Sequence, residues 1–110
     1  AKLNGTEDSA EGFYGFETKY LEEGVTATIP APYSDELIAQ LQDMAVTCFR
    51  ALDCKSLARV DFFVTDNGPV LNEVNTMPGF TAISMYPQVW AATGVDYPEL
   101  LSTLIRTALR

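Results

Sequence analysis

The sequence has no histidine and only two cysteines among its 110 residues, and its 7 lysines and arginines are outnumbered by 15 aspartates and glutamates. Without histidine, and with Cys48 and Cys54 in a non-helical spacing, no zinc-binding set can be assembled. The two thiols are expected to be free and buried or half-buried, as in a reducing compartment. The net charge of -8 argues against binding nucleic acid or an anionic membrane through a basic patch.

Long apolar runs are also missing from the sequence. No stretch approaches the ~20 residues that would span a bilayer, and the polar residues 1–15 contain no secretory apolar segment. With 47% hydrophobic and 20% charged residues, the composition predicts a packed core in a cytoplasmic protein. At this length the chain is one domain or a piece of a larger one, and a missing partner domain would leave apolar surface exposed.

Local patterns predict an α/β (α+β) fold, beginning with a loop, a strand and a helix. Residues 1–24 show no steady period and are interrupted by Gly5, Gly12 and Gly15, which indicates a long loop of the kind used as a lid or binding loop. Residues 25–29 are β-branched and end at Pro30, as a short strand does. Ser34 then begins an amphipathic helix. Its predicted buried stripe consists of Leu37, Leu41, Met44, Ala45, Cys48 and Leu52.

The second half of the chain reads as a hairpin followed by two helices. Residues 57–65 and 69–75 are strand-like, and residues 66–68 between them, with the sequence Asp-Asn-Gly, form a compact turn signal. Residues 76–81 form a Pro-Gly loop. One short helix is expected over residues 87–93, ended by Gly94, and a second from the N-cap Asp96 to residue 110.

The predicted hairpin gathers polar side chains on one face. A three-residue loop pairs Thr65 with Pro69, and counting outward places Asp61 opposite Glu73. Side chains alternate faces along a strand, so one face carries Arg59, Asp61, Glu73 and Asn75. The other face is apolar and suited to packing on a helix, with Val60, Phe62, Val64, Val70 and Val74.

This polar face has two interpretations. Opposed carboxylates destabilise a sheet unless a cation lies between them. Magnesium suits Asp61 and Glu73 because it prefers hard oxygen ligands, and Asn75 could add a carbonyl oxygen as a further ligand. Alternatively, Arg59 pairs with either carboxylate in a solvated salt-bridge cluster. A one-residue slip in register would move the whole set to the other face, so both interpretations stay open at this point.

Two segments resemble the D-alanine–D-alanine ligases, a family of ATP-grasp enzymes. Residues 58–87, ARVDFFVTDNGPVLNEVNTMPGFTAISMYP, are similar to the family's signature region, and residues 13–20, FYGFETKY, to its mobile ω-loop, with small departures at Gly15 and Thr18. The resemblance covers nearly the whole chain. It implies the carboxy-terminal ATP-grasp subdomain, a sheet with a β-hairpin backed by helices, in which residues 1–24 are the ω-loop or lid and residues 25–110 the metal- and phosphate-binding core.

The resemblance also implies a nucleotide and metal site. Two magnesium ions, for which manganese could substitute, would bridge the phosphates of ATP and be held by Asp61, Glu73 and Asn75, with Glu73 shared between the ions. Lys19 would reach the phosphates, with Phe13 and Tyr14 near the nucleotide. From the residues alone, Lys19 reads as a solvated loop lysine.

A catalytic and a substrate site follow from the same resemblance. Arg59 and the backbone N–H of Gly79 would stabilise the charge of the acyl phosphate and of the tetrahedral intermediate. Ser84 and the backbone of Met85 would hold the carboxylate of the second D-alanine, while Tyr20 would close the lid. From the residues alone, Gly79 is a turn residue and Ser84 a helix N-cap.

The implied reaction is the ATP-dependent ligation of two D-alanines, through an acyl phosphate, for peptidoglycan precursors of the cell wall, with D-lactate a poor second substrate. The family's amino-terminal portion, which binds the first D-alanine and the adenine, is expected outside these residues, so the chain alone should be inactive. The full-length enzyme is expected to be a cytoplasmic homodimer that binds neither nucleic acid nor membrane. The alternatives are another ATP-grasp carboxylate–amine ligase and a non-catalytic fragment.

Overall fold

The computed structural model describes residues 2–4 and 26–110, in two compact units, residues 1–32 and 33–110. In the first unit, β1 (Lys2–Asn4) pairs antiparallel with β2 (Thr26–Thr28). The strand predicted over residues 25–29 is therefore present. Lys2–Asn4, predicted as loop, forms a strand instead, because a three-residue segment is too short to show a period and its structure comes from its partner. No helix in residues 2–4 and 26–110 is long and apolar enough to cross a membrane.

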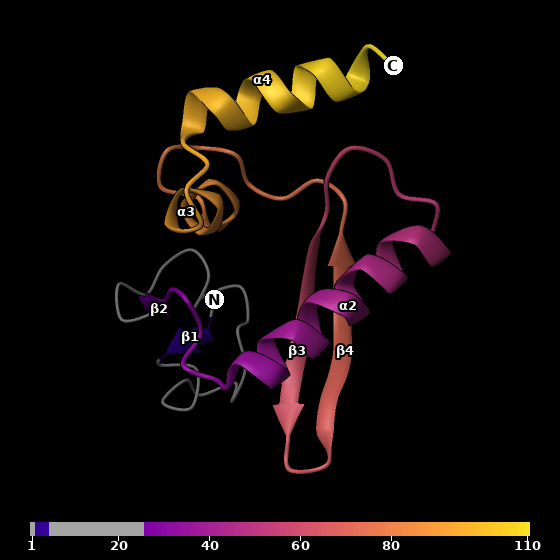
Figure 1. Ribbon diagram of the computed structural model, residues 1–110, viewed down its shortest axis with the longest axis vertical. Helices are drawn as coiled ribbons and strands as arrows, with labels where there is room; N and C mark the ends of the chain where they lie inside the picture. Colours follow the sequence, from indigo (N-terminus) through magenta and orange to yellow (C-terminus); the bar gives the residue numbers. More distant parts are fainter. Residues whose placement is uncertain (1, 5–25) are drawn as a thin grey trace. The chain divides into compact units, whose positions relative to one another are not determined.

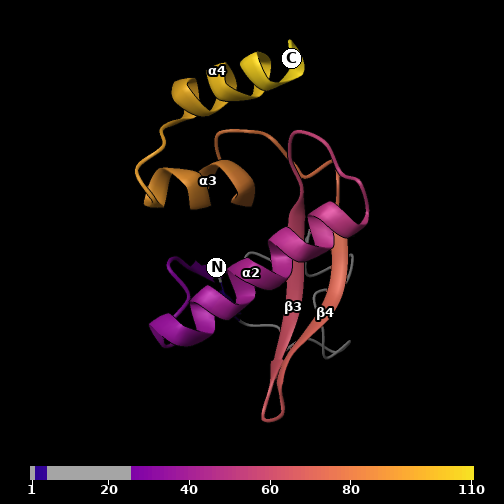
Figure 2. The ribbon, with the colours of Figure 1, turned by 45° about the vertical axis from the view of Figure 1, so that its right-hand side comes forward.

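The second unit begins with helix α2 (Asp35–Ala51). Ser34 is its N-cap, and the Ser34 Oγ accepts the Leu37 N–H at 3.2 Å. The helix runs along the hairpin and contacts both of its strands (Figures 1 and 2). All members of the predicted stripe are half-buried except Leu52, which is 61% exposed. Leu52 is the C-cap and lies outside the helix, so the helical period does not place its side chain on the buried face.

The hairpin consists of β3 (Arg59–Thr65) and β4 (Gly68–Asn75). Thr65 pairs with Gly68, so the turn has two residues rather than the three predicted. The Thr65 hydroxyl donates to the Gly68 carbonyl at 2.6 Å and accepts the Asn67 N–H at 3.2 Å. Gly68 has a φ of 112°, a conformation that only glycine adopts cheaply. These contacts stabilise the tighter turn.

A β-bulge lies further along the ladder. Asp61 pairs with Glu73 while its neighbour Phe62 pairs with Leu71, so Asn72 is an extra residue in β4. The extra residue offsets the shorter turn, and the predicted pairing of Asp61 with Glu73 is confirmed. The predicted face of Val70 is wrong, because Val70 pairs with Phe63 and so shares the face of Asp61.

Two helices complete the chain, α3 (Met85–Ala92) and α4 (Tyr97–Ala108), and they contact each other. Helix α3 starts two residues earlier than predicted, with Ser84 as N-cap, and Gly94, with a φ of 99°, follows its end. Asp96 caps α4 as predicted, accepting the Glu99 N–H at 2.9 Å. Helices together with an antiparallel hairpin confirm the α+β class.

Little of the described chain is fully buried. Among the described residues, Leu100, which is 4% exposed, is the buried hydrophobic side chain, and Pro78 and Pro87 are also buried. Many large apolar side chains are exposed instead, as expected for a modest core. They are Val46, Leu52, Phe63, Val64, Val70, Leu71, Met77, Ile83, Trp90, Leu101, Ile105 and Leu109.

Candidate functional site

Arg59 joins the two opposed carboxylates of the hairpin. Its Nε donates to Asp61 Oδ1 at 2.9 Å, and its Nη2 donates to Asp61 Oδ2 at 2.9 Å and to Glu73 Oε1 at 3.1 Å. The hydrogen bond to Asp61 is the largest cause that raises the pKa of Arg59; burial opposes it, and the charges of Asp61 and Glu73 act with it. The guanidinium is therefore firmly charged and supplies the cation that opposed carboxylates require.

The carboxylates nevertheless keep capacity for a further ligand. A carboxylate oxygen carries two lone pairs; each Asp61 oxygen accepts one hydrogen bond, and Glu73 Oε2 accepts none from the described residues. The two side chains are 34% and 46% exposed, so a solvated cation can reach them. Within the described ranges no three His, Cys, Asp or Glu side chains gather into a metal-binding group, and a third ligand would have to be of another type.

Asn75 is the residue that can provide it. Its Oδ1 accepts the Met77 N–H at 2.9 Å, a local turn that orients the amide and leaves one lone pair of Oδ1 unused. Because Asn75 pairs with Arg59 and Asp61 with Glu73, these side chains share one face. Two carboxylates and an amide carbonyl in this arrangement fit the oxygen-rich coordination of magnesium.

Arg59 also has donors to spare. A guanidinium carries five N–H groups, and the contacts with Asp61 and Glu73 engage Nε and Nη2. The two N–H groups of Nη1 make no hydrogen bond with the described residues. Arg59 can therefore bind an oxyanion through Nη1 while its other nitrogens stay on the carboxylates, without a change of rotamer.

Gly79 and Ser84 approach each other in the loop after the hairpin. The Ser84 Oγ accepts the Thr81 N–H at 2.9 Å and bonds the Thr81 hydroxyl at 2.7 Å. A Cβ added at Gly79 would lie 3.2 Å from that Oγ, which is tighter than ordinary van der Waals contact. The contact with Ser84 therefore favours a residue without a Cβ at position 79.

The start of α3 offers backbone donors beside Ser84. The Ser84 side chain makes no capping bond to the helix, and the Met85 N–H has no acceptor among the described residues. Unpaired N–H groups at a helix start, together with the helix dipole, favour an anionic group such as a carboxylate. Ser84 and Met85 therefore lie side by side where a small anion can bind.

Aromatic rings hold this loop between α3 and α4. The Phe80 ring lies 5.9 Å from that of Tyr86 and 5.5 Å from that of Tyr97, centroid to centroid. The Tyr97 hydroxyl also reaches the Phe80 carbonyl oxygen at 3.4 Å, and Trp90 extends the cluster from Tyr86 at 6.4 Å. Ring contacts of this kind add to the energy of burial, so the loop that carries Gly79 is positioned by its flanking helices.

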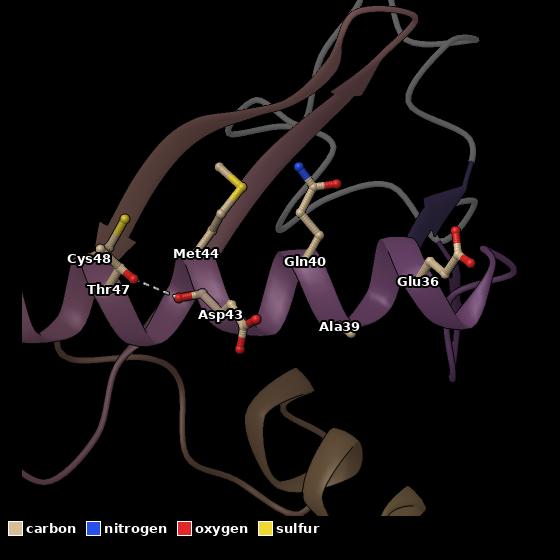
Figure 3. Close-up of a pocket in the computed structure, with 7 residues that line it drawn as sticks. All are labelled: Glu36, Ala39, Gln40, Asp43, Met44, Thr47 and Cys48. Carbon is tan, nitrogen blue, oxygen red and sulfur yellow. Dashed lines mark hydrogen bonds between the residues drawn. The ribbon is translucent and has the colours of Figure 1, made fainter.

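A separate hollow of about 600 Å³ lies along α2. Figure 3 shows Met44 and Cys48 pointing to one side of the helix and Asp43 to the other, with the Thr47 hydroxyl bonded to the Asp43 carbonyl oxygen at 2.9 Å. None of the predicted site residues that the structure describes lines this hollow. Its described lining consists of Glu36, Ala39, Gln40, Asp43, Met44, Thr47 and Cys48. Cys48 and Cys54 are free and half-buried, as predicted.

The predicted site residues fall into three groups. The hairpin brings together Arg59, Asp61, Glu73 and Asn75, and the following loop brings together Gly79, Ser84 and Met85. Phe13, Tyr14, Lys19 and Tyr20 lie outside the described residues. Sequence reasoning missed Thr81 and the bulge at Asn72. The spacing of Thr81 three residues before Ser84, ahead of a helix, could have indicated the first; a bulge leaves no local signal.

Residues 3–106 match the family described as D-ala D-ala ligase C-terminus. The chain belongs to this family. It is also 64% identical over 109 residues to the D-alanine–D-alanine ligase of Corynebacterium efficiens, a match that covers 99% of this chain and 30% of that protein. The chain spans about 30% of the length of the curated relatives it matches.

Solved structures agree with this membership of the D-alanine–D-alanine ligase family. The Bacillus anthracis D-alanine–D-alanine ligase complexed with ATP matches with a TM-score of 0.69 and 39% identity, over 73% of this chain and 28% of that one. The VanG D-Ala:D-Ser ligase of Enterococcus faecalis matches with a TM-score of 0.75 and 36% identity, over 96% of this chain and 29% of that one. The fold is therefore shared by ligases with different second substrates.

Proposed function

We propose that these residues form the carboxy-terminal part of an ATP-dependent D-alanine–D-alanine ligase that makes D-alanyl-D-alanine for peptidoglycan precursors. Residues 1–24 would be its lid and residues 25–110 its metal- and phosphate-binding core. The observation that carries the proposal is the set of Arg59, Asp61, Glu73 and Asn75 on one face of the hairpin, in a chain that matches this family over residues 3–106. The ATP complex of a relative supports the choice of nucleotide.

Asp61, Glu73 and Asn75 would hold the magnesium. Their free lone pairs suit one or two hard cations, with Glu73 shared between two ions, and manganese could substitute. When bound, the ions would neutralise charge on the ATP phosphates during phosphoryl transfer. Arg59 would keep the two carboxylates in place from one side and leave the opposite side of each to the metal.

The remaining described residues would act on the substrates. The γ-phosphoryl group of ATP passes to a carboxylate oxygen of the first D-alanine, the amine of the second attacks the acyl carbon, and phosphate leaves. Arg59 Nη1 and the Gly79 N–H would donate to the oxygens that gain negative charge. Ser84 Oγ and the Met85 N–H would hold the second carboxylate and leave the amine free.

The lid and the amino-terminal portion complete the proposal. Lys19 would reach the ATP phosphates, Phe13 and Tyr14 would lie near the nucleotide, and Tyr20 would close the pocket and exclude water from the acyl phosphate. The sites for the first D-alanine and for adenine would come from the amino-terminal portion that the longer relatives contain. The full-length enzyme would be a cytoplasmic homodimer, and residues 1–110 alone would be inactive.

A second candidate is ligation of D-alanine to D-serine. It is favoured by one observation, the match of 96% of this chain to a D-Ala:D-Ser ligase. The hairpin set serves phosphoryl transfer in either case, so it does not choose the second substrate. That choice would depend on Tyr20, Ser84 and Met85.

Competition among second substrates tests the proposal. The full-length enzyme, supplied with Mg-ATP and D-alanine at neutral pH, should form D-alanyl-D-alanine in preference to products of added D-serine or D-lactate. Tyr20→Phe should weaken that preference, and dipeptide products are measured by mass spectrometry. A preference for D-serine would establish the second candidate, and ATP consumption with none of the three would contradict both. Calorimetry of residues 1–110 alone with Mg-ATP should show no binding comparable to that of the full-length enzyme.

A further inference from the structure

The bulge in β4 lies directly beside the candidate metal site. Asn72 is unpaired between Leu71, which faces Phe62, and Glu73, which faces Asp61. If Asn72 were removed, every remaining pair from Thr65–Gly68 to Arg59–Asn75 could form in one regular ladder, by direct counting of the register. The extra residue is therefore needed neither to close the hairpin nor to keep Glu73 on the face of Asp61.

The Asn72 side chain does not explain the insertion either. Asn72 is exposed, and its side chain makes no hydrogen bond with the described residues. A bulge disrupts the ladder, bends the strand and increases its local twist, and bulges are frequent beside active sites, where they redirect a side chain. The contribution of Asn72 must therefore come from its backbone, as one additional residue at this point of the strand.

The bulge also divides the site face into two parts. On its Asn75 side the face carries Arg59, Asp61, Glu73 and Asn75; on its turn side the face carries the pair of Phe63 and Val70, which are 54% and 52% exposed. The change in strand direction thus falls where the polar part of the face begins. The two candidate ligands of β4, Glu73 and Asn75, lie just beyond it.

We infer that the Asn72 bulge is a positioning element, which turns the end of β4 so that the Glu73 carboxylate and the Asn75 amide converge with Asp61 on one cation. The inference rests on the proposed function. It concerns the number of residues in the strand, not the identity of the asparagine. A regular ladder would keep the same residues paired but would aim Glu73 and Asn75 differently.

Three variants of the full-length enzyme test it. The first lacks Asn72; the second is Asn72→Ala, which keeps the residue count; the third lacks Asn72 and carries an added glycine after Gly68, which moves the extra residue into the turn at constant length. Manganese binding is measured by electron paramagnetic resonance in the presence of ADP. Urea unfolding gives the free energy of unfolding of the metal-free protein. Steady-state kinetics gives the magnesium concentration at half-maximal rate separately from kcat.

The deletion should leave the metal-free protein at least as stable as wild type. Its manganese affinity should fall about tenfold or more, which is the loss typical of removing groups that orient metal ligands. The relocated variant should behave in the same way, and Asn72→Ala should bind manganese as wild type does. Wild-type affinity in either variant without the bulge overturns the inference, as does failure of both to fold. A wild-type enzyme that binds no manganese overturns the metal assignment of the proposed function instead.

Discussion

The hairpin and the loop that follows it position their candidate residues by different means. On the hairpin, backbone pairing decides which side chains share a face, and one extra residue, Asn72, shifts the register. In the loop, aromatic rings and the Ser84–Thr81 hydrogen bonds hold the backbone at Gly79. The first region should therefore be sensitive to the number of residues, and the second to the volume of single side chains.

The hairpin and the loop also differ in the charged side chains that they contain. The sequence indicates a repulsion between Asp61 and Glu73 that a cation must relieve, and Arg59 already supplies that cation within the chain. Because this ion pair is formed, replacing Asp61 or Glu73 by its neutral amide should not stabilise the metal-free protein. The loop contains no charged side chain between Thr76 and Ser84 and relies on dipoles and N–H groups.

The largest effect is expected from neutralising the hairpin carboxylates. In the full-length enzyme, Glu73→Gln or Asp61→Asn should lower turnover about 100-fold or more, because metal-ion stabilisation of the transition state contributes several kcal/mol. Asp61→Asn should also destabilise the metal-free protein by up to ~1 kcal/mol, since it breaks a two-pronged but partly exposed ion pair.

Steady-state kinetics at saturating magnesium and urea unfolding check both effects. Asp53→Asn is the matched control, because that carboxylate pairs with Lys55 at 86% exposure and should change neither quantity. Near-normal turnover in Glu73→Gln or Asp61→Asn would contradict the ligand assignment.

An intermediate effect is expected in the loop. Gly79→Ala should destabilise the protein by about 1 kcal/mol, because the new Cβ meets Ser84 Oγ at 3.2 Å and two hydrogen bonds to Thr81 prevent that oxygen from moving away. Ser84→Ala loses both hydrogen bonds to Thr81, but the double variant should lose less stability than the two single losses added together, since the next atom, Ser84 Cβ, lies at 3.7 Å.

Urea unfolding of both single variants and the double variant measures this coupling. The KM for the second D-alanine should stay raised in the double variant, because Ser84 Oγ is gone. Additive stability losses would show that the contact between Gly79 and Ser84 does not limit the loop.

The smallest effect is expected from Tyr97→Phe. The variant loses one long hydrogen bond, from the hydroxyl to the Phe80 carbonyl oxygen at 3.4 Å, and should lose about 0.5 kcal/mol of unfolding free energy. Tyr97→Leu also removes the ring contact with Phe80 and should cost more and raise the KM for the second D-alanine. Equal results for the two variants would mean that the rings do not position the loop.

Much of the fold could be predicted because its signals are local. Ser34 and Asp96 cap helices with their own side chains, and the alternation of residues around Asp61 and Glu73 reveals a polar face. The turn was predicted one residue too long and the bulge was missed, and these two errors cancelled at the site. The register of Asp61 was therefore right, while the face of Val70, between the turn and the bulge, was wrong.

The sequence by itself determined the helices, the two strands of the hairpin and the family to which the chain belongs, because capping, alternation and motif order act over a few neighbouring residues. Only the tertiary structure decided that Arg59 joins Asp61 to Glu73 and that Asn72 is bulged. A two-residue and a three-residue turn are both compatible with Asp-Asn-Gly. The choice between them is made by pairing along the entire ladder, whose energy no short segment of sequence contains.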